Sequence, residues 1–162
     1  MIKNMVLISC LATSAVLGFA GGDAAFAETV LKMKAQGVNV GDIQNFKLTD
    51  GSTTQLVTGR TVWTGTEGDM AGQSWSVTCH GLGKVTADGV YSSTNRCEET
   101  HSAEDTINGD YKDTAEGGDW VITGGTGKYK GATGGGHITY TWGDTVFGDR
   151  ITMTYEGTIT LP

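Results

Sequence analysis

The end of the chain has the most regular pattern of hydrophobic and polar positions. From Ile151 to Leu161, apolar residues alternate with threonine or glutamate, apart from one glycine at position 157. Successive side chains of a β-strand point to opposite faces, so a period of two predicts a strand with one face in a core and the other in water. His137 to Trp142 precedes it, and the two segments form a predicted hairpin.

A second hairpin is predicted from Gln73 to Thr86 and from Val90 to His101, joined by Ala87-Asp88-Gly89. A three-residue loop that ends in glycine suits a type I turn closed by a glycine bulge. If the residues that flank this turn face one another, Cys79 falls directly opposite Cys97. Directly opposed cysteines are within reach of a disulfide at a non-hydrogen-bonded pair. The turn and the cysteines therefore select the same register and predict a Cys79–Cys97 disulfide.

The rest of the chain also has the pattern of a β protein. Thr, Val, Ile, Tyr and Trp recur in short runs separated by Gly, Asp and Asn, and the one proline is the final residue. Proline cannot donate to a strand ladder, so its scarcity agrees with strands. Further strands are predicted for Thr29 to Ala35, Asn45 to Thr49, Gln55 to Thr66 and Asp119 to Thr123. About eight strands without a linker predict an all-β fold, a small antiparallel β-barrel, because closure removes exposed edges.

Residues 1–27 have the pattern of a secretory signal peptide, which leaves residues 28–162 as a single predicted domain. Lys3 supplies a positive charge, Met5 to Ala20 is apolar, and Ala25-Phe26-Ala27 fits the cleavage rule. The apolar run is shorter than the roughly 20 residues of a membrane span. We therefore expect a secreted or periplasmic protein with no membrane span after cleavage, in a compartment that permits a disulfide.

Charge and composition exclude several classes of function. The chain has 11 Lys and Arg against 18 Asp and Glu, a net charge of −7, and no basic cluster that would bind nucleic acid or an anionic membrane. His80, His101 and His137 are scattered without the spacing of a zinc motif. We therefore predict no metal site and no cofactor.

Residues 122–134 read Ile-Thr-Gly-Gly-Thr-Gly-Lys-Tyr-Lys-Gly-Ala-Thr-Gly. The segment resembles the Gly-Gly-Thr-Gly-x-aromatic-x-Gly-Ala-x-Gly signature of dirigent proteins, and allene oxide cyclases carry a similar segment. The resemblance implies an antiparallel barrel of about eight strands that binds hydrophobic small molecules and steers radical coupling or cyclisation inside it. Thr133 stands where those families often have arginine. A structural role is the alternative, in which the glycines supply turns and close strand crossings and Tyr129 plugs one barrel end.

The predicted register of the second hairpin also identifies candidate catalytic residues. Glu99 and His101 fall on its more apolar face, opposite Val77 and Trp75. A carboxylate beside a histidine in an apolar lumen can share its proton, as general acid and base pairs do. The alternative is that both residues lie at an open barrel mouth, where water satisfies them.

Large side chains on the apolar faces of the two predicted hairpins are candidate ligand-binding residues. They are Trp75, Tyr91, Tyr140, Met153 and Tyr155. Packing in a filled core would account for the same residues. Ligand pockets are mostly apolar with a few polar groups, so an open lumen with this lining would bind a small hydrophobic molecule.

Three functions are therefore compatible with the sequence. The first is an exported barrel that binds a small hydrophobic molecule in its lumen. The second is a cyclase or isomerase in which Glu99 and His101 manage a proton. The third is an envelope or secreted interaction protein with a packed barrel. The sequence leaves open whether the protein is an enzyme.

Overall fold

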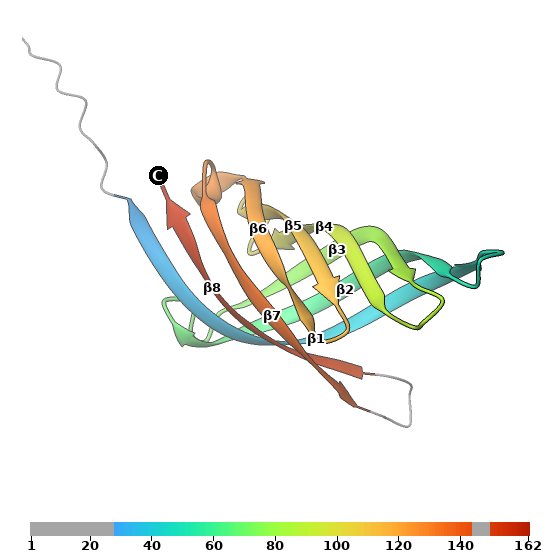
Figure 1. The fold of residues 1–162 in the computed structure, drawn as a ribbon. Helices are drawn as coiled ribbons and strands as arrows, with labels where there is room; N and C mark the ends of the chain where they lie inside the picture. The colour runs from blue at the N-terminus through green and yellow to red at the C-terminus, as the bar shows by residue number, and fades with distance from the viewer. Residues whose placement is uncertain (1–27, 144–149) are drawn as a thin grey trace, which may run out of the picture.

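The strands of this chain close into one barrel. The computed structural model describes residues 28–143 and 150–162. Within them, eight strands pair antiparallel in chain order, and β8 closes the barrel against β1 (Figure 1). The strands are β1 (Thr29–Lys47), β2 (Thr53–Gly68), β3 (Ser74–Val85), β4 (Tyr91–Thr100), β5 (Thr106–Thr114), β6 (Gly117–Gly125), β7 (Thr133–Gly143) and β8 (Arg150–Leu161). The predicted all-β antiparallel barrel is confirmed.

The β3–β4 hairpin has the predicted register. Cys79 pairs with Cys97 in the ladder, and the two form a disulfide. The turn has the predicted chemistry, because Gly89 has a φ of 88° and its N–H donates to the carbonyl of Thr86 at 2.9 Å. A glycine adopts this left-handed conformation without the steric cost that a side chain would add. The turn and the two cysteines therefore both predict the register that the structure has.

β1 is longer than the pattern predicts. The sequence predicts two strands, at 29–35 and 45–49, whereas the structure has one strand of 19 residues. It pairs with β2 from Met33 to Lys47 across Gly37 and Gly41. A Cβ on Gly37 would lie 2.7 Å from the indole Cε3 of Trp63. The glycine therefore makes room for a core tryptophan instead of ending the strand.

β5 was not predicted from the sequence at all. Asn108-Gly109-Asp110 lies in its middle, and these are residue types typical of turns. The segment is extended because it pairs with β4 on one side and β6 on the other. Ile107, Tyr111 and Asp113 are buried, so the strand does alternate, with a glycine and a carboxylate among its inward positions.

One end of the barrel is tightly packed. The largest fully buried side chains of the described residues are Trp120, Tyr129, Ile107, Ile159 and Cys97, and Ile107, Tyr129 and Ile159 lie near this end. Tyr129 belongs to the short 3-10 helix η1 (Gly127–Tyr129), which lies between β6 and β7 within the glycine-rich segment. Its side chain is 0% exposed. The predicted plugging role of Tyr129 agrees with this burial.

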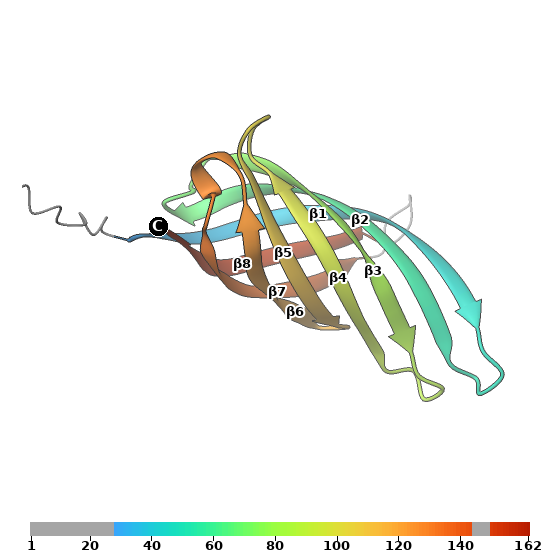
Figure 2. The same ribbon diagram turned by 90° about the horizontal axis from the view of Figure 1, so that it is seen from above.

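The opposite end of the barrel carries the β1–β2 and β3–β4 hairpins, which project beyond the other strands (Figure 2). β1 and β8 begin and end at the packed end, where Thr29 pairs with Leu161. None of the residues that the structure describes belongs to a helix long and apolar enough to cross a membrane. The predicted signal segment, residues 1–27, lies outside the described residues.

Candidate functional site

A cavity of about 290 Å³ lies inside the barrel. Side chains from β1, β2, β3, β4, β5, β7 and β8 and from Ala115, just after β5, form its wall. The apolar and aromatic part of the wall consists of Ile43, Val57, Trp63, Val77, Cys79, Tyr91, Tyr111, Ala115, Ile138, Tyr140 and Met153. An apolar concave site of this size is typical of pockets that hold small molecules.

The cavity has a buried floor and a mouth that reaches solvent. Trp63, Val77, Tyr111 and Met153 belong both to the cavity wall and to the packed core, so they form the floor. Ile43 also lines the cavity, and its side chain is 51% exposed. Ile43 lies near the end of β1, so the mouth lies toward the end of the barrel that carries the β1–β2 hairpin.

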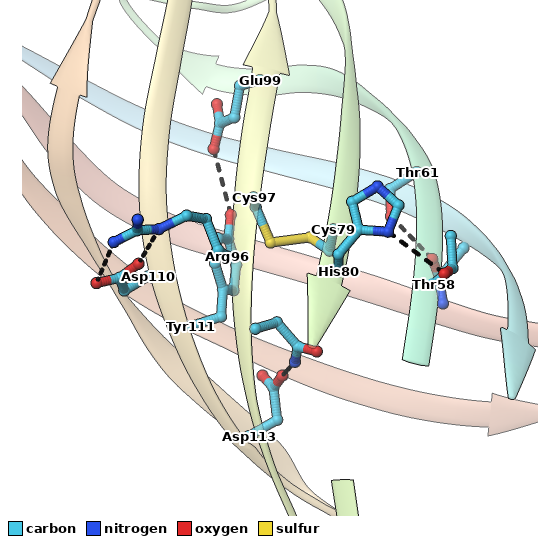
Figure 3. The surroundings of a disulfide bond; sticks show 12 residues. Thr58, Thr61, Cys79, His80, Arg96, Cys97, Glu99, Asp110, Tyr111 and Asp113 are labelled. Carbon is cyan, nitrogen blue, oxygen red and sulfur yellow. Dashed lines mark hydrogen bonds and ion pairs between the residues drawn. A yellow bond between two sulfur atoms is a disulfide. The ribbon is translucent and has the colours of Figure 1, made fainter. Parts of the chain in front are cut away.

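A buried carboxylate is the centre of a polar cluster on the cavity wall. Asp113 is 7% exposed and accepts hydrogen bonds from three neutral groups. Ser93 Oγ donates at 3.1 Å and Asn95 Nδ2 at 2.8 Å to Oδ2, and Tyr140 OH donates at 2.7 Å to Oδ1. Figure 3 shows Asp113 below the Cys79–Cys97 disulfide. These donors satisfy much of the hydrogen-bonding capacity of the carboxylate.

Glu99 and His101 point into the barrel, as predicted, but they lie outside the cavity wall. Their side chains are 4% and 5% exposed, and Glu99 Oε2 is 3.6 Å from His101 Nε2, an ion-pair distance that is too long for a hydrogen bond. The hydroxyl of Tyr111, which lines the cavity, donates to Glu99 Oε1 at 3.2 Å (Figure 3). The pair therefore contacts the cavity wall through Tyr111. This burial differs from the alternative of a solvated barrel mouth.

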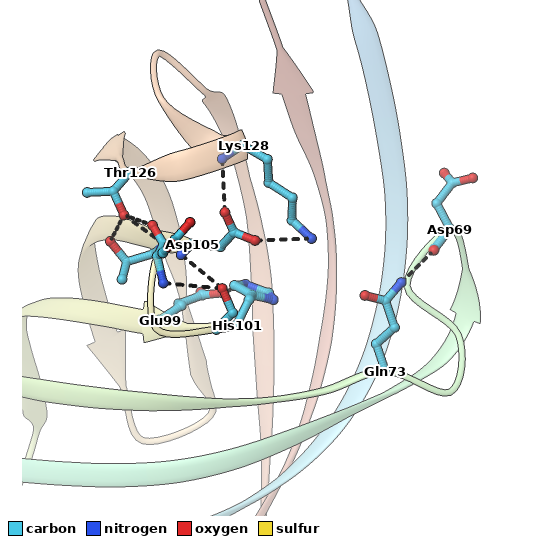
Figure 4. A network of polar contacts seen from close by, with 10 residues as sticks. Asp69, Gln73, Glu99, His101, Asp105, Thr126 and Lys128 are labelled. Atoms are coloured by element: carbon cyan, nitrogen blue, oxygen red, sulfur yellow. Dashed lines mark hydrogen bonds and ion pairs between the residues drawn. The ribbon is translucent and has the colours of Figure 1, made fainter.

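The packed end of the barrel holds His101 in place. Its ring stacks on Trp75 at a centroid distance of 5.3 Å and lies 4.8 Å from the ring of Tyr129. Its backbone N–H donates to the carbonyl of Asp105 at 3.0 Å. Asp105 in turn accepts the backbone N–H of Lys128 at 3.0 Å (Figure 4). The β4–β5 loop and η1 therefore hold His101 in place from the packed end of the barrel.

The predicted ligand-binding residues divide between the cavity and the core. Tyr91, Tyr140 and Met153 line the cavity. Trp75 and Tyr155 also point inward, but they are 4% and 3% exposed and pack in the core, where Trp75 stacks on His101 and Tyr155 contacts two tryptophan rings. The alternation of the strands predicts which face a side chain takes, and it carries no information on how far along the barrel the cavity extends.

Several cavity residues were missed from the sequence. Asp113 lies in β5, the strand that the pattern did not predict, and Trp63 and Asn95 lie on strands that it did predict. Asn95 has the same parity along β4 as Cys97 and Glu99, so the register signal for the inward face also applies to it. Polar side chains are mostly exposed, so an asparagine amide in a strand gives no sign of its own that it lines a cavity.

We expect the pKa values of the tyrosines to reflect their burial inside the barrel. Burial raises the pKa of all five tyrosines, that of Tyr129 to about 12. The tyrosines of an unfolded chain have a pKa of about 10. Because the folded state holds its phenolic protons more tightly, the free energy of unfolding should fall as the pH rises above about 10. Ultraviolet absorbance of tyrosinate should therefore have its midpoint well above that of the same chain in denaturant, and coinciding midpoints would contradict the described burial.

The fold and the cavity define a small closed antiparallel barrel with a ligand-sized interior. No family model matches the chain, and no curated protein matches it. Among solved structures, it is similar to the pterocarpan synthase dirigent protein GePTS1, with a TM-score of 0.54 and 15% sequence identity over 85% of this chain and 88% of that chain. The pterocarpan synthase dirigent protein PsPTS1 is matched with a TM-score of 0.46 and 15% identity over 83% of this chain and 95% of that chain.

The chain therefore has a dirigent-like barrel, which confirms at the level of the fold the resemblance seen in residues 122–134. A shared fold hosts many activities, so the activity has to be argued from the cavity itself.

Proposed function

We propose that this protein binds a small hydrophobic molecule in the barrel cavity. The observation that supports this function best is the cavity of about 290 Å³ with a mainly apolar wall and a mouth at Ile43. Burial of apolar ligand surface contributes about 25 cal/mol per Å² before the costs of association are subtracted. A preformed apolar cavity lowers those costs, because the wall is already ordered.

An acid–base enzyme of cyclase or isomerase type is the second candidate. Glu99, His101 and Tyr111 favour it, because the hydroxyl of Tyr111 connects the buried pair to the cavity wall. In such an enzyme Glu99 and His101 are positioning residues, since Tyr111 stands between them and a ligand. The similar protein GePTS1 is a pterocarpan synthase, which makes catalysis in a barrel of this kind chemically reasonable. The cavity argues against the third candidate, an interaction protein with a fully packed barrel.

We propose a secreted or periplasmic location for this binding function. The signal pattern of residues 1–27 and the Cys79–Cys97 disulfide support it together. Disulfides persist in oxidising compartments outside the cytosol. A ligand of such a protein would be met outside the cytoplasm, or carried there.

Filling the mouth of the cavity tests the proposed function. Val57 is half-buried on the cavity wall, whereas its neighbour Leu56 points outward and is 44% exposed. We expect Val57→Trp to weaken binding of ethylbenzene, a neutral apolar probe, at least about tenfold, because the indole occupies the space of the ligand; this corresponds to about 1.4 kcal/mol. Leu56→Trp adds the same side chain outside the barrel and should leave the affinity unchanged.

Binding is measured by NMR titration, with native mass spectrometry of the protein from its own host as the search for a natural ligand. Equal affinities of the two tryptophan variants would place the ligand outside the cavity. If no compound co-purifies and ethylbenzene does not bind the wild-type chain, the proposed function is wrong.

A further inference from the structure

The electrostatics of the cavity wall limit the chemistry of the ligand, given the proposed binding function. Among the described residues that line the cavity, Asp113 is the one with a charged side chain, and it is 7% exposed. No lysine, arginine or histidine whose side chain the structure describes forms an ion pair with its carboxylate; the side chain of Arg150 lies outside that description. A buried charge is normally paired, and among the described side chains this carboxylate has no cationic partner.

The hydrogen bonds of Asp113 leave room for one more donor. An ionised carboxylate has about four lone-pair positions. Ser93, Asn95 and Tyr140 occupy three of them, as described above. All three donors are neutral, so none of the described side chains places a positive charge against the carboxylate. A cationic donor would supply both the missing bond and the missing charge.

Other groups on the same wall also suit a donor rather than an acceptor. The side-chain oxygen of Gln55 is buried at the cavity wall and accepts no hydrogen bond from the described residues. Tyr91 and Tyr140 also line the cavity, and the faces of aromatic rings attract cations. The net charge of −7 also raises the concentration of cations near the protein.

We propose that the ligand of this cavity is a small hydrophobic amine whose protonated nitrogen pairs with Asp113. The fold has already removed the carboxylate from water, so the ligand adds the desolvation of its own ammonium group alone. The apolar body of the ligand then packs against the floor formed by Trp63, Val77 and Met153.

The test compares three probes of nearly equal shape: ethylbenzene, 2-phenylethanol and 2-phenylethylamine. The first carries no donor, the second carries a neutral donor, and the third is an ammonium ion at neutral pH. We expect the wild-type chain to bind the amine at least about tenfold more tightly than either neutral probe, because hydrogen bonds to charged groups are stronger than neutral ones.

Two variants on β5 locate the effect. Asp113→Asn removes the charge inside the cavity, and it should remove the preference for the amine. Asp110→Asn removes the same charge from the outer face of the same strand, where Asp110 pairs with Arg96 at 3.0 Å, and it should keep the preference. A preference that survives Asp113→Asn would overturn the proposal.

Measurements on the wild-type chain keep the proposal testable even if Asp113→Asn does not fold. Salt screens exposed charges much more than buried ones, so the preference for the amine should persist in about 1 M NaCl. A preference that disappears there would assign it to the acidic surface. Equal affinities for the three probes, or an alcohol that binds as tightly as the amine, would overturn the proposal and leave the binding function intact. Failure of all three probes to bind would overturn the amine proposal, and together with the absence of a co-purifying compound it would overturn the binding function as well.

Discussion

Replacing Trp120 by alanine should lower the free energy of unfolding by about 3–5 kcal/mol. The indole is 1% exposed, stacks on Tyr111 at a centroid distance of 5.5 Å and meets Tyr155 edge-on at 5.3 Å. It also covers Gly109, where a Cβ would lie 2.8 Å from the indole Cε3. The surrounding strands are tied together in a closed barrel and cannot collapse far into the space that the indole leaves, so the cost includes a cavity as well as lost burial.

Denaturant unfolding followed by circular dichroism measures this effect, with Val121→Ala as the control. Val121 is the next residue, points outward and is 58% exposed, so its truncation should change stability by less than about 0.5 kcal/mol. Similar losses for the two variants would mean that Trp120 is not packed as described. Because Tyr111 also lines the cavity, Trp120→Ala should weaken ethylbenzene binding as well.

Removing the disulfide should have an effect of similar size. Cys79 and Cys97 are separated by 18 residues. For a loop of that length, the loss of the chain-entropy constraint on the unfolded state predicts about 3 kcal/mol. The double variant Cys79→Ala with Cys97→Ala should therefore unfold at a lower denaturant concentration than the oxidised wild type.

Reduction provides the matched control for this prediction. Adding dithiothreitol should move the wild-type midpoint toward that of the double variant and leave the double variant unchanged. If reduction does not shift the wild-type midpoint, the prediction is wrong. The bridge then does not constrain the unfolded chain beyond the structure that this chain keeps by itself. Cys79 lines the cavity, so the affinities of the double variant and of the reduced wild type for ethylbenzene show whether ligand binding depends on the bridge.

The hairpins were the part of the fold that could be predicted from the sequence. In β3–β4, the turn at 87–89 and the two cysteines indicated one register independently, and the structure has that register. In β8, strict alternation indicated the inward face, and Met153, Tyr155 and Ile159 are buried there. Such local signals suffice wherever pairing is between neighbours in the chain.

The strands that were missed depend on partners that the local sequence does not show. Asn108-Gly109-Asp110 is extended because β4 and β6 both pair with it, and Gly37 continues β1 because Trp63 fills the space next to it. Tertiary pairing overrides local turn propensity in both places. The same limitation hid Asp113, since a residue on an unpredicted strand cannot be assigned to a face.

The sequence predicted which side chains of the candidate site point into the barrel, but it did not predict how far along the barrel the cavity extends. Parity placed Glu99, His101 and Tyr91 on the inward face, and all three point into the barrel. The cavity nevertheless ends before it reaches Glu99 and His101, because the side chains of Trp63, Val77 and Tyr111 form its floor. Which inward residues reach a ligand is decided by side chains from several strands at once, and no single strand carries that information.

The pairing of Thr29 with Leu161 places both ends of the barrel domain side by side at the packed end, as Figure 1 also shows. The cavity opens at the other end, beyond Ile43. If the barrel is joined to a surface, a partner or a carrier domain through either terminus, its opening will therefore face away from the point of attachment. The protein can be tethered without being blocked, so immobilised protein is suitable for ligand capture.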